Sequence, residues 1–115
     1  MLQRLDTEHL NRLAVVEVLS KLEPTEFDIR DASRCICAHT LRLLAAHRST
    51  SYAWQVQLEA GAKLLGLTID DAKLLFVPAG RYTSTDRATH PHDAARVVRY
   101  LAATETVDWS VAGKL

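Results

Sequence analysis

The chain has 115 residues, with 14 basic and 14 acidic side chains, so its formal net charge at pH 7 is zero. Proteins that bind nucleic acid mainly through phosphates normally carry a basic face, and the balanced charge argues against this class. The length predicts a single domain over residues 1–115, large enough to be stable without metal ions or disulfides.

The N-terminus and the cysteines indicate the cellular location. The first twelve residues, MLQRLDTEHLNR, are charged from Arg4 onward and lack the apolar segment of a signal peptide. Two cysteines without such a signal are typical of a reducing compartment, and the apolar stretches are too short to span a membrane. We therefore expect a cytoplasmic protein that does not contact the membrane.

The first helix is expected to begin near Asp6 or Thr7, which can accept hydrogen bonds from the first turn, and to stop before Glu23-Pro24. Apolar residues cover most of its circumference. They are Leu10, Leu13, Val15, Val16, Val18, Leu19 and Leu22. Such a helix is either central in its own domain or also contacts a second chain.

The second helix is expected over about residues 30–47, where one face repeats every 3.6 residues. That face consists of Ala32, Cys35, Ile36, His39, Leu43 and Ala46. The third helix follows the polar segment HRSTS, and its apolar face consists of Trp54, Leu58, Gly61 and Leu65. Because glycine costs about 1 kcal/mol relative to alanine inside a helix, Gly61 predicts the close approach of another helix.

Gly66 is placed to end the third helix in the left-handed conformation. Thr68-Ile69-Asp70-Asp71 then forms a capping box that opens a short fourth helix, which extends to about Phe76. The following segment, RYTSTDRATH, is polar and has no helical period. A final helix is expected from about Pro91, which suits the first turn. Its buried face consists of Ala94, Val97, Val98 and Leu101.

The tail after the final helix is irregular, and we expect Trp109 to cover one end of the core. No run of alternating apolar and polar residues is long enough for a strand. The sequence therefore predicts an all-α fold: a compact single-domain bundle of about five helices with a polar loop before the last helix.

The segment RCICAHT contains Cys35, Cys37 and His39 within five positions. On a helix the two cysteines would point about 160° apart, so they could not share a metal ion or form a disulfide. Cys35 and His39 would share a face, which is a workable spacing for two zinc ligands. Two further ligands would have to come from His9, His47, His90 or His92. No second C-x2-C or H-x3-H unit supplies them, so the segment favours core packing with no metal and no cofactor.

Residues from about 53 to 76 resemble a helix-turn-helix unit in outline, which reads DNA with the first residues of its second helix. Here those residues are Ile69, Asp70 and Asp71, and Lys73 is the only cation beside them. Because phosphates repel carboxylates, two packed helices in a bundle are the favoured interpretation, and we do not expect nucleic acid to bind. A nucleic-acid-binding regulator is the alternative function, with cations supplied by Arg81, Arg87, Arg96 and Arg99.

Catalytic motifs do not occur in the sequence, which has no G-x-S-x-G, P-loop, H-E-x-x-H or G-x-G-x-x-G. Asp70 and Asp71 are explained by capping and by the helix dipole. The segment HPHD at residues 90–93 is explained by a helix N-terminus, where Asp93 also favours the dipole. We therefore predict that the protein is not an enzyme.

The polar segment before the last helix is the first candidate for a partner-binding surface. It contains Arg81, Tyr82 and Arg87, which are residue types enriched at protein interfaces. A solvated loop without a partner is the alternative. The first helix, which is apolar nearly all round, is the second candidate surface.

Three stretches, FDIRDASRCICAHT, AKLLGLTIDDAKLLFVP and DAARVVRYLAATETVDW, lie within residues 27–109. Their order of F-D, Cys-Ile, L-L-G-L, L-F and V-D-W resembles a group of small proteins from actinobacteria and especially their bacteriophages, of the mycobacteriophage type. The chain departs from the group at Arg30, where many members carry a second cysteine, and at Cys37-Ala38, which replaces an Ala-Gly step. The group has no established activity. The resemblance therefore implies a source and a fold, and the departures imply packing at Cys35.

These observations predict a small non-enzymatic accessory protein, encoded by a phage, that binds a host or phage protein in the bacterial cytoplasm. A second copy of the chain is also a candidate partner. The alternative is the nucleic-acid-binding regulator, and a third hypothesis is a zinc-supported form of either.

Overall fold

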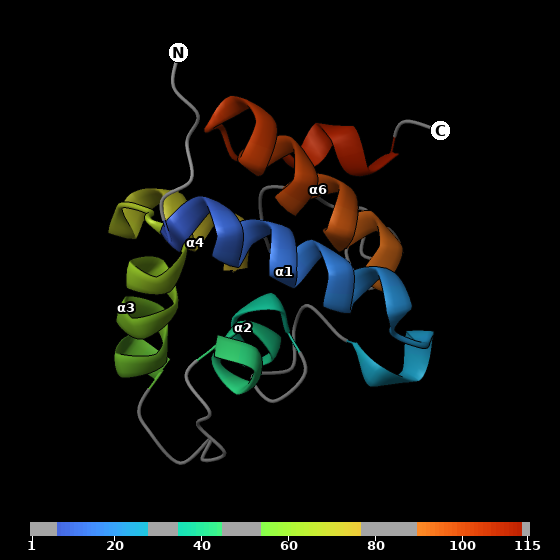
Figure 1. Ribbon diagram of the computed structural model, residues 1–115, viewed down its shortest axis with the longest axis horizontal. Coiled ribbons are helices and arrows are strands. Elements are labelled where there is room, and N and C mark those ends of the chain that lie inside the picture. The colour runs from blue at the N-terminus through green and yellow to red at the C-terminus, as the bar shows by residue number, and fades with distance from the viewer. Residues whose placement is uncertain (1–6, 28–34, 45–53, 77–89, 114–115) are drawn as a thin grey trace.

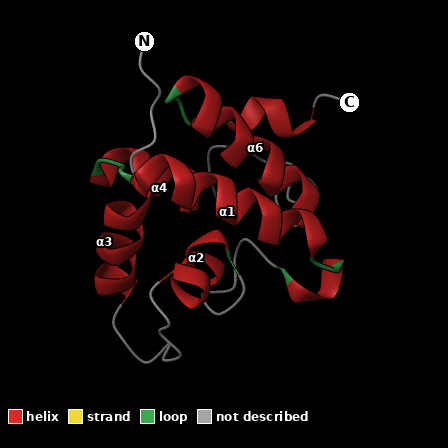
Figure 2. Cartoon of the chain, in the orientation of Figure 1, coloured by secondary structure: helices red, strands yellow, loops and turns green. Residues whose placement is uncertain are grey.

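Helices pack on helices throughout the part of the chain that the computed structural model describes, which is residues 7–27, 35–44, 54–76 and 90–113. Its α-helices are α1 (Thr7–Lys21), α2 (Ile36–Leu44), α3 (Trp54–Leu65), α4 (Ile69–Phe76) and α6 (Pro91–Thr104). Two short 3-10 helices, η1 (Pro24–Glu26) and η2 (Trp109–Gly113), follow α1 and α6, and these residues contain no strand (Figure 2). The radius of gyration is 13.0 Å, close to the roughly 13 Å of a compact domain of this length. The predicted all-α bundle is confirmed.

The central helix of the bundle is α1, which is one of the two roles that its apolar circumference predicted. It packs most extensively against α6 and also contacts α2 and α3 (Figure 1). The helix begins at Thr7 and ends at Lys21, in agreement with the stop predicted before Glu23-Pro24. None of the described helices is long and apolar enough to cross a membrane.

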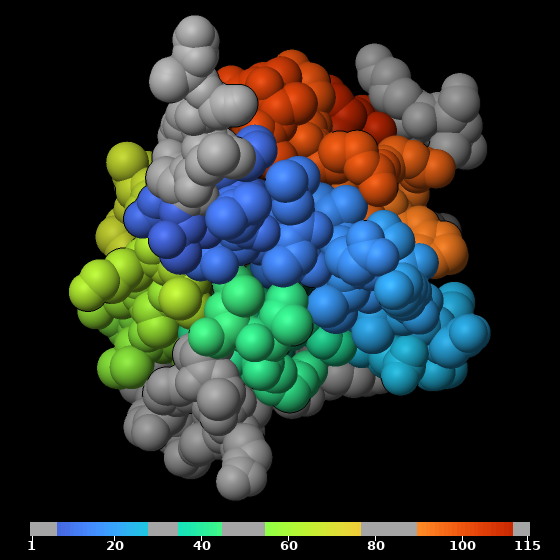
Figure 3. Space-filling model, viewed as in Figure 1, coloured from blue at the N-terminus to red at the C-terminus, as the bar shows by residue number. Residues whose placement is uncertain are grey.

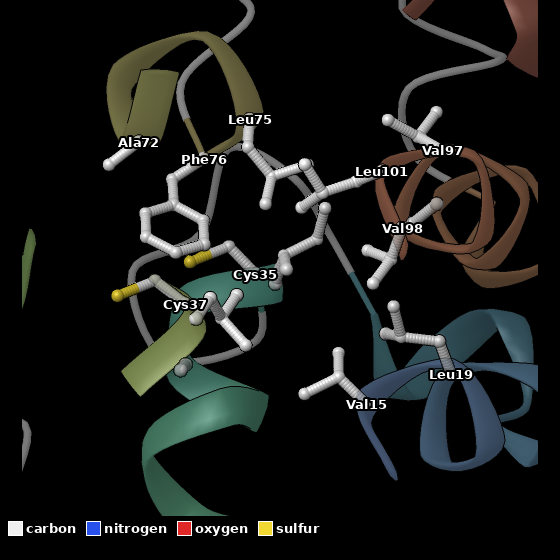
Figure 4. Packing of buried hydrophobic residues seen from close by; sticks show 14 of the residues in the cluster. Val15, Leu19, Cys35, Cys37, Ala72, Leu75, Phe76, Val97, Val98 and Leu101 are labelled. Atoms are coloured by element: carbon white, nitrogen blue, oxygen red, sulfur yellow. The ribbon is translucent and has the colours of Figure 1, made fainter. Parts of the chain in front are cut away.

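The packing of α6 against the rest of the bundle follows the predicted face. The side chains of that face are all essentially inaccessible to water; they are Ala94, Val97, Val98 and Leu101. Figure 4 shows α6 contributing to the core opposite Val15 and Leu19 of α1, while α4 contributes Phe76 from another side. The helix begins at Pro91 as predicted, because His90 caps it: its Nδ1 accepts a hydrogen bond from the backbone N–H of His92 at 3.1 Å.

The tail folds back as predicted. Trp109 is 4% exposed, and its indole Nε1–H donates to the carbonyl of Leu74 in α4 at 2.9 Å. This carbonyl lies in the last turn of α4, where no further helical N–H follows to pair with it. Through this contact η2, which packs on α6, is also attached to α4.

The corner between α3 and α4 forms as the sequence predicts. Gly66 has a φ of 69°, which only glycine adopts without strain. The N–H of Leu67 donates to the carbonyl of Ala62 at 2.8 Å, and the N–H of Gly66 donates to that of Lys63 at 3.3 Å, which together form a Schellman motif. Thr68 then caps α4, because its Oγ1 accepts from the N–H of Asp71 at 3.1 Å, which is one of the two hydrogen bonds of the predicted capping box.

A buried arginine holds this corner against α1, and the sequence did not predict it. Arg12 is 3% exposed. Its guanidinium makes three hydrogen bonds. Nε donates to the carbonyl of Leu65 at 2.8 Å, and Nη2 donates to the carbonyl of Gly66 at 3.3 Å. Nη1 donates to the carboxylate of Glu105 at 2.9 Å. The neighbouring Asn11 donates to the carbonyl of Leu64 at 2.7 Å. Two adjacent residues of α1 therefore satisfy the last carbonyls of α3 and join them to the end of α6.

Gly61 lies where two neighbouring elements meet α3, as its position in the apolar face predicts. A Cβ atom at this position would lie 2.9 Å from the Sγ of Cys37 in α2 and 2.9 Å from the ring of Phe76 in α4. Leu58 and Leu65 of the same face are buried. The side chain of Trp54 lies outside the described part of the structure.

The prediction for α2 is wrong in two respects. The helix begins at Ile36, and Cys35 precedes it: its carbonyl accepts the first helical hydrogen bond, from the N–H of His39 at 3.0 Å. The buried face also differs, because Leu43 is 42% exposed. The buried residues of α2 are Ile36, Cys37, Ala38, Thr40 and Leu41. The predicted face included Cys35, which precedes the helix, and it therefore assigned the wrong side of α2 to the core.

Candidate partner-binding surfaces

The predicted partner-binding residues Arg81, Tyr82 and Arg87 lie outside the described residues, as does the polar loop that contains them. Their role stays a prediction. Two other surfaces can be built from the described residues.

The first surface is a pocket between α6 and η2. Arg96, Arg99, Tyr100 and Ala103 line it from α6, and Val111 lines it from η2, around a volume of about 300 Å³. Positions 96, 99, 100 and 103 follow the helical repeat, so they lie along one side of α6, next to its buried face. Ala103 contributes only a methyl group to this lining. The pocket is open to solvent, and its walls are almost entirely apolar.

The charges around this pocket are uneven. Arg96 donates to the carboxylate of Asp93 one turn earlier, at 2.6 Å. Arg99 is exposed and forms no ion pair with any of the described residues. On the tail, the carboxylate of Asp108 accepts from the N–H of Ser110 at 2.9 Å and from its hydroxyl at 2.7 Å. The residues that line the pocket therefore carry cations and no carboxylate.

The second surface is the outer side of α1. Leu10 is 51% exposed and Leu13 is 44% exposed, and a separation of three residues makes them neighbours on the helix. Figure 3 shows α1 crossing the middle of one face of the molecule, with α6 on one side and α2 on the other. The apolar circumference of α1 is therefore divided: one side is central to the core, and another side leaves two leucines exposed. Contact of this second side with another chain stays a prediction.

The metal site considered for Cys35 and His39 would need further ligands from elsewhere in the chain. No three His, Cys, Asp or Glu side chains among the described residues come close enough to hold a metal ion, and His47 lies outside them. The His39 ring is positioned by other contacts: Nε2 donates to the carbonyl of Glu26 at 2.9 Å, and the ring stacks on Phe27 with centroids 6.1 Å apart. His39 thus has a backbone partner, and this hydrogen bond is exposed to solvent.

The two cysteines are free thiols buried in the core. They do not point to opposite faces, as a helix through both would require, because Cys35 precedes α2. Figure 4 shows both sulfur atoms on the same side of the core, beside Phe76. Burial, with a smaller contribution from the neighbouring Cys35, raises the pKa of Cys37 to about 12. Its thiol donates to the carbonyl of Gln57 at 3.3 Å, so Cys37 is a neutral packing group at physiological pH.

The unit formed by α3 and α4 is the segment that the sequence likened in outline to a helix-turn-helix. The exposed residues at the start of α4 are Thr68, Ile69, Asp70 and Lys73. The second helix of such a unit would bring Asp70 toward phosphates, which repel it.

The segment HPHD begins α6, as the sequence predicts. The rings of His90 and His92 meet edge to face, with centroids 4.8 Å apart. The Nδ1 of His90 is occupied as the helix cap, and Asp93 binds Arg96. The Nδ1 of His90 and the carboxylate of Asp93 therefore have structural roles in the first turn of α6.

The comparisons give no relative for this chain: no family model, no curated protein and no solved structure matches it. Of the pocket residues, sequence reasoning named Arg96 and Arg99, as cations for nucleic acid, and missed Tyr100, Ala103 and Val111. In the sequence, the helical spacing of residues 96, 99, 100 and 103 indicates that they share one side of α6. The hollow itself also depends on the tail, which folds back beside α6.

Proposed function

We propose that the protein is a small non-enzymatic accessory protein, encoded by a phage, that acts by binding a host or phage protein in the bacterial cytoplasm. The observation that carries this proposal is the adjacent pair Leu10 and Leu13, each about half exposed on the central helix. Neighbouring apolar side chains on a helix are the anchors with which helices bind grooves in partner proteins. The core on the other side of α1 is complete, so these leucines are not needed to hold the fold.

The test is a native mass spectrum of the tagged full chain, purified gently from an actinobacterial host. We expect a stoichiometric protein partner, and we expect the double substitution Leu10→Glu and Leu13→Glu to remove it. The matched control is the double substitution Leu43→Glu and Val56→Glu, which adds the same two charges at exposed apolar positions of α2 and α3. Unchanged thermal unfolding of both variants would show that the loss concerns binding.

Two results would contradict the proposal. One is a bare monomer for the unchanged chain. The other is turnover of a small substrate that is abolished by substitution of Arg81 or His90. A doubled mass that the leucine substitutions halve would instead identify a second copy of the chain as the partner.

The regulator that binds nucleic acid has no comparable support, because the start of α4 exposes Asp70 and Ile69. It predicts steeply salt-dependent retention on DNA. If the full chain is not retained on immobilised DNA at low salt, this alternative function is excluded.

A further inference from the structure

The pocket between α6 and η2 has the dimensions of a site for one bulky side chain. Its volume of about 300 Å³ lies at the lower end of the range for ligand pockets, roughly 300–1,000 Å³. Tyr100, which is 36% exposed, Val111 and the small Ala103 all line it. A hollow with apolar walls suits an aromatic or aliphatic anchor of a partner.

The charge around the pocket restricts the partner further. Arg99 is exposed and has no ion pair among the described residues, while Arg96, one turn earlier, is already neutralised by Asp93 at 2.6 Å. The five donors of an arginine fork match a carboxylate in a bidentate geometry. Asp93 is engaged by Arg96, and Asp108 accepts hydrogen bonds from Ser110. The site therefore presents an apolar hollow beside a guanidinium that the described residues leave for an external anion.

We propose that this pocket binds an acidic segment of a partner protein, which places a bulky apolar side chain between Tyr100 and Val111 and a carboxylate against Arg99. The inference rests on the proposed function, because it specifies the chemistry of the protein partner at a second surface. Nucleic acid fits less well. Affinity for a phosphate backbone grows with the number of phosphates neutralised, and here a single guanidinium without a partner stands beside apolar walls.

The probe is a displayed library of random twelve-residue peptides, selected on the immobilised full chain. We expect enrichment of peptides that combine Asp or Glu with a neighbouring Trp, Phe or Leu. Binding of the best peptide is expected to weaken about tenfold or more with Arg99→Glu, because a charge-assisted pair becomes a repulsion. Ala103→Trp should have a similar effect, because the new ring would occupy the hollow.

Lys63→Glu is the matched control, since it makes the same charge change on an exposed position of α3 and should leave binding unchanged. Thermal unfolding of each variant is measured alongside. If Ala103→Trp unfolds, Tyr100→Ala replaces it as the variant that alters the apolar wall. Arg99 is exposed, so its substitution does not disturb the core.

Several outcomes would overturn the inference: no enriched peptide, enriched peptides without acidic residues, or binding that is indifferent to Arg99→Glu and Ala103→Trp. Retention of a random DNA duplex or of anionic phosphatidylglycerol vesicles that depends on Arg99 would also overturn it, in favour of that ligand. These outcomes are separate from the mass spectrum of the leucine variants. A partner lost with Leu10→Glu and Leu13→Glu but kept with Arg99→Glu would uphold the proposed function and reject this pocket.

Discussion

Arg12 shows how a charged side chain can be buried without a large penalty. Desolvation of a guanidinium is costly unless its donors are paired, and here they are shared between two helix C-terminal carbonyls and one carboxylate. The C-terminus of a helix carries partial negative charge, so the cation is also placed favourably with respect to the dipole of α3. Glu105 remains half exposed, and its carboxylate therefore keeps part of its hydration.

We predict that Arg12→Ala lowers the free energy of unfolding by about 2–4 kcal/mol, because it leaves buried carbonyl groups of α3 without donors. Arg12→Lys should cost less, since it keeps the charge but cannot reach all three acceptors. Unfolding in urea measures both. The control is Arg99→Ala, an exposed position where the change should stay within about 0.5 kcal/mol. Equal midpoints for Arg12→Ala and Arg99→Ala would show that the Arg12 contacts add nothing to stability.

The buried thiol of Cys37 predicts a loss of folding stability at alkaline pH. Its pKa in the fold is about 12, raised from the ordinary value of 9.0. Between these two values the unfolded chain has lost this proton and the folded chain has kept it. The free energy of unfolding should therefore fall as pH rises from 9 toward 12, with a slope of up to about 1.4 kcal/mol per pH unit from this group.

Urea unfolding at several pH values, compared between the unchanged chain and Cys37→Ala, measures that slope. The variant should lose stability less steeply above pH 9. At pH 8 a thiol reagent should label the folded chain only as fast as it unfolds, because the thiol is both buried and protonated. Rapid labelling of folded protein at pH 8 would contradict this account.

At the scale of elements, the helices with strong local signals were the ones predicted correctly. Gly66 and Thr68 set the corner between α3 and α4, and Pro91 set the start of α6, because each acts through neighbours in the chain. The start of α2 was mispredicted, since a periodic apolar face does not distinguish a helix from the buried residue that precedes it. The contacts of Arg12 could not be predicted from neighbouring residues, because its acceptors lie 53, 54 and 93 residues away along the chain.

The residue that ends α6, Glu105, has a backbone conformation that glycine adopts more easily. Glu105 caps the helix with φ 65° and ψ 21°, the left-handed conformation in which a residue with a Cβ is strained. Both Glu105→Ala and Glu105→Gly remove the carboxylate that binds Arg12, but only glycine relieves the strain. We predict that the glycine variant is more stable than the alanine variant by about 1 kcal/mol. Urea unfolding of the pair is the measurement, and equal stabilities would mean that the cap stores no strain.

At the scale of the whole molecule, the pocket exists because the two ends of the described chain are tied to the same core. α1 contacts α6 and is joined to its C-terminus through Arg12, while η2 folds back on α6 and reaches α4 through Trp109. The arginines of the pocket could be named from the sequence. The hollow could not, since it depends on where Val111 comes to lie beside α6, and that placement follows from the burial of a tryptophan two residues earlier.

This arrangement predicts that residues 1–115 unfold as one cooperative unit. Trp54→Phe leaves Trp109 as the sole tryptophan, so its fluorescence reports on the tail, while far-ultraviolet circular dichroism reports on all helices. The two urea transitions should coincide, because Trp109 is buried against α4 and donates to the carbonyl of Leu74. A fluorescence change at lower urea would show that η2 detaches first. In that case the pocket would be lost before the bundle, and binding of an acidic peptide should disappear over the same range of urea.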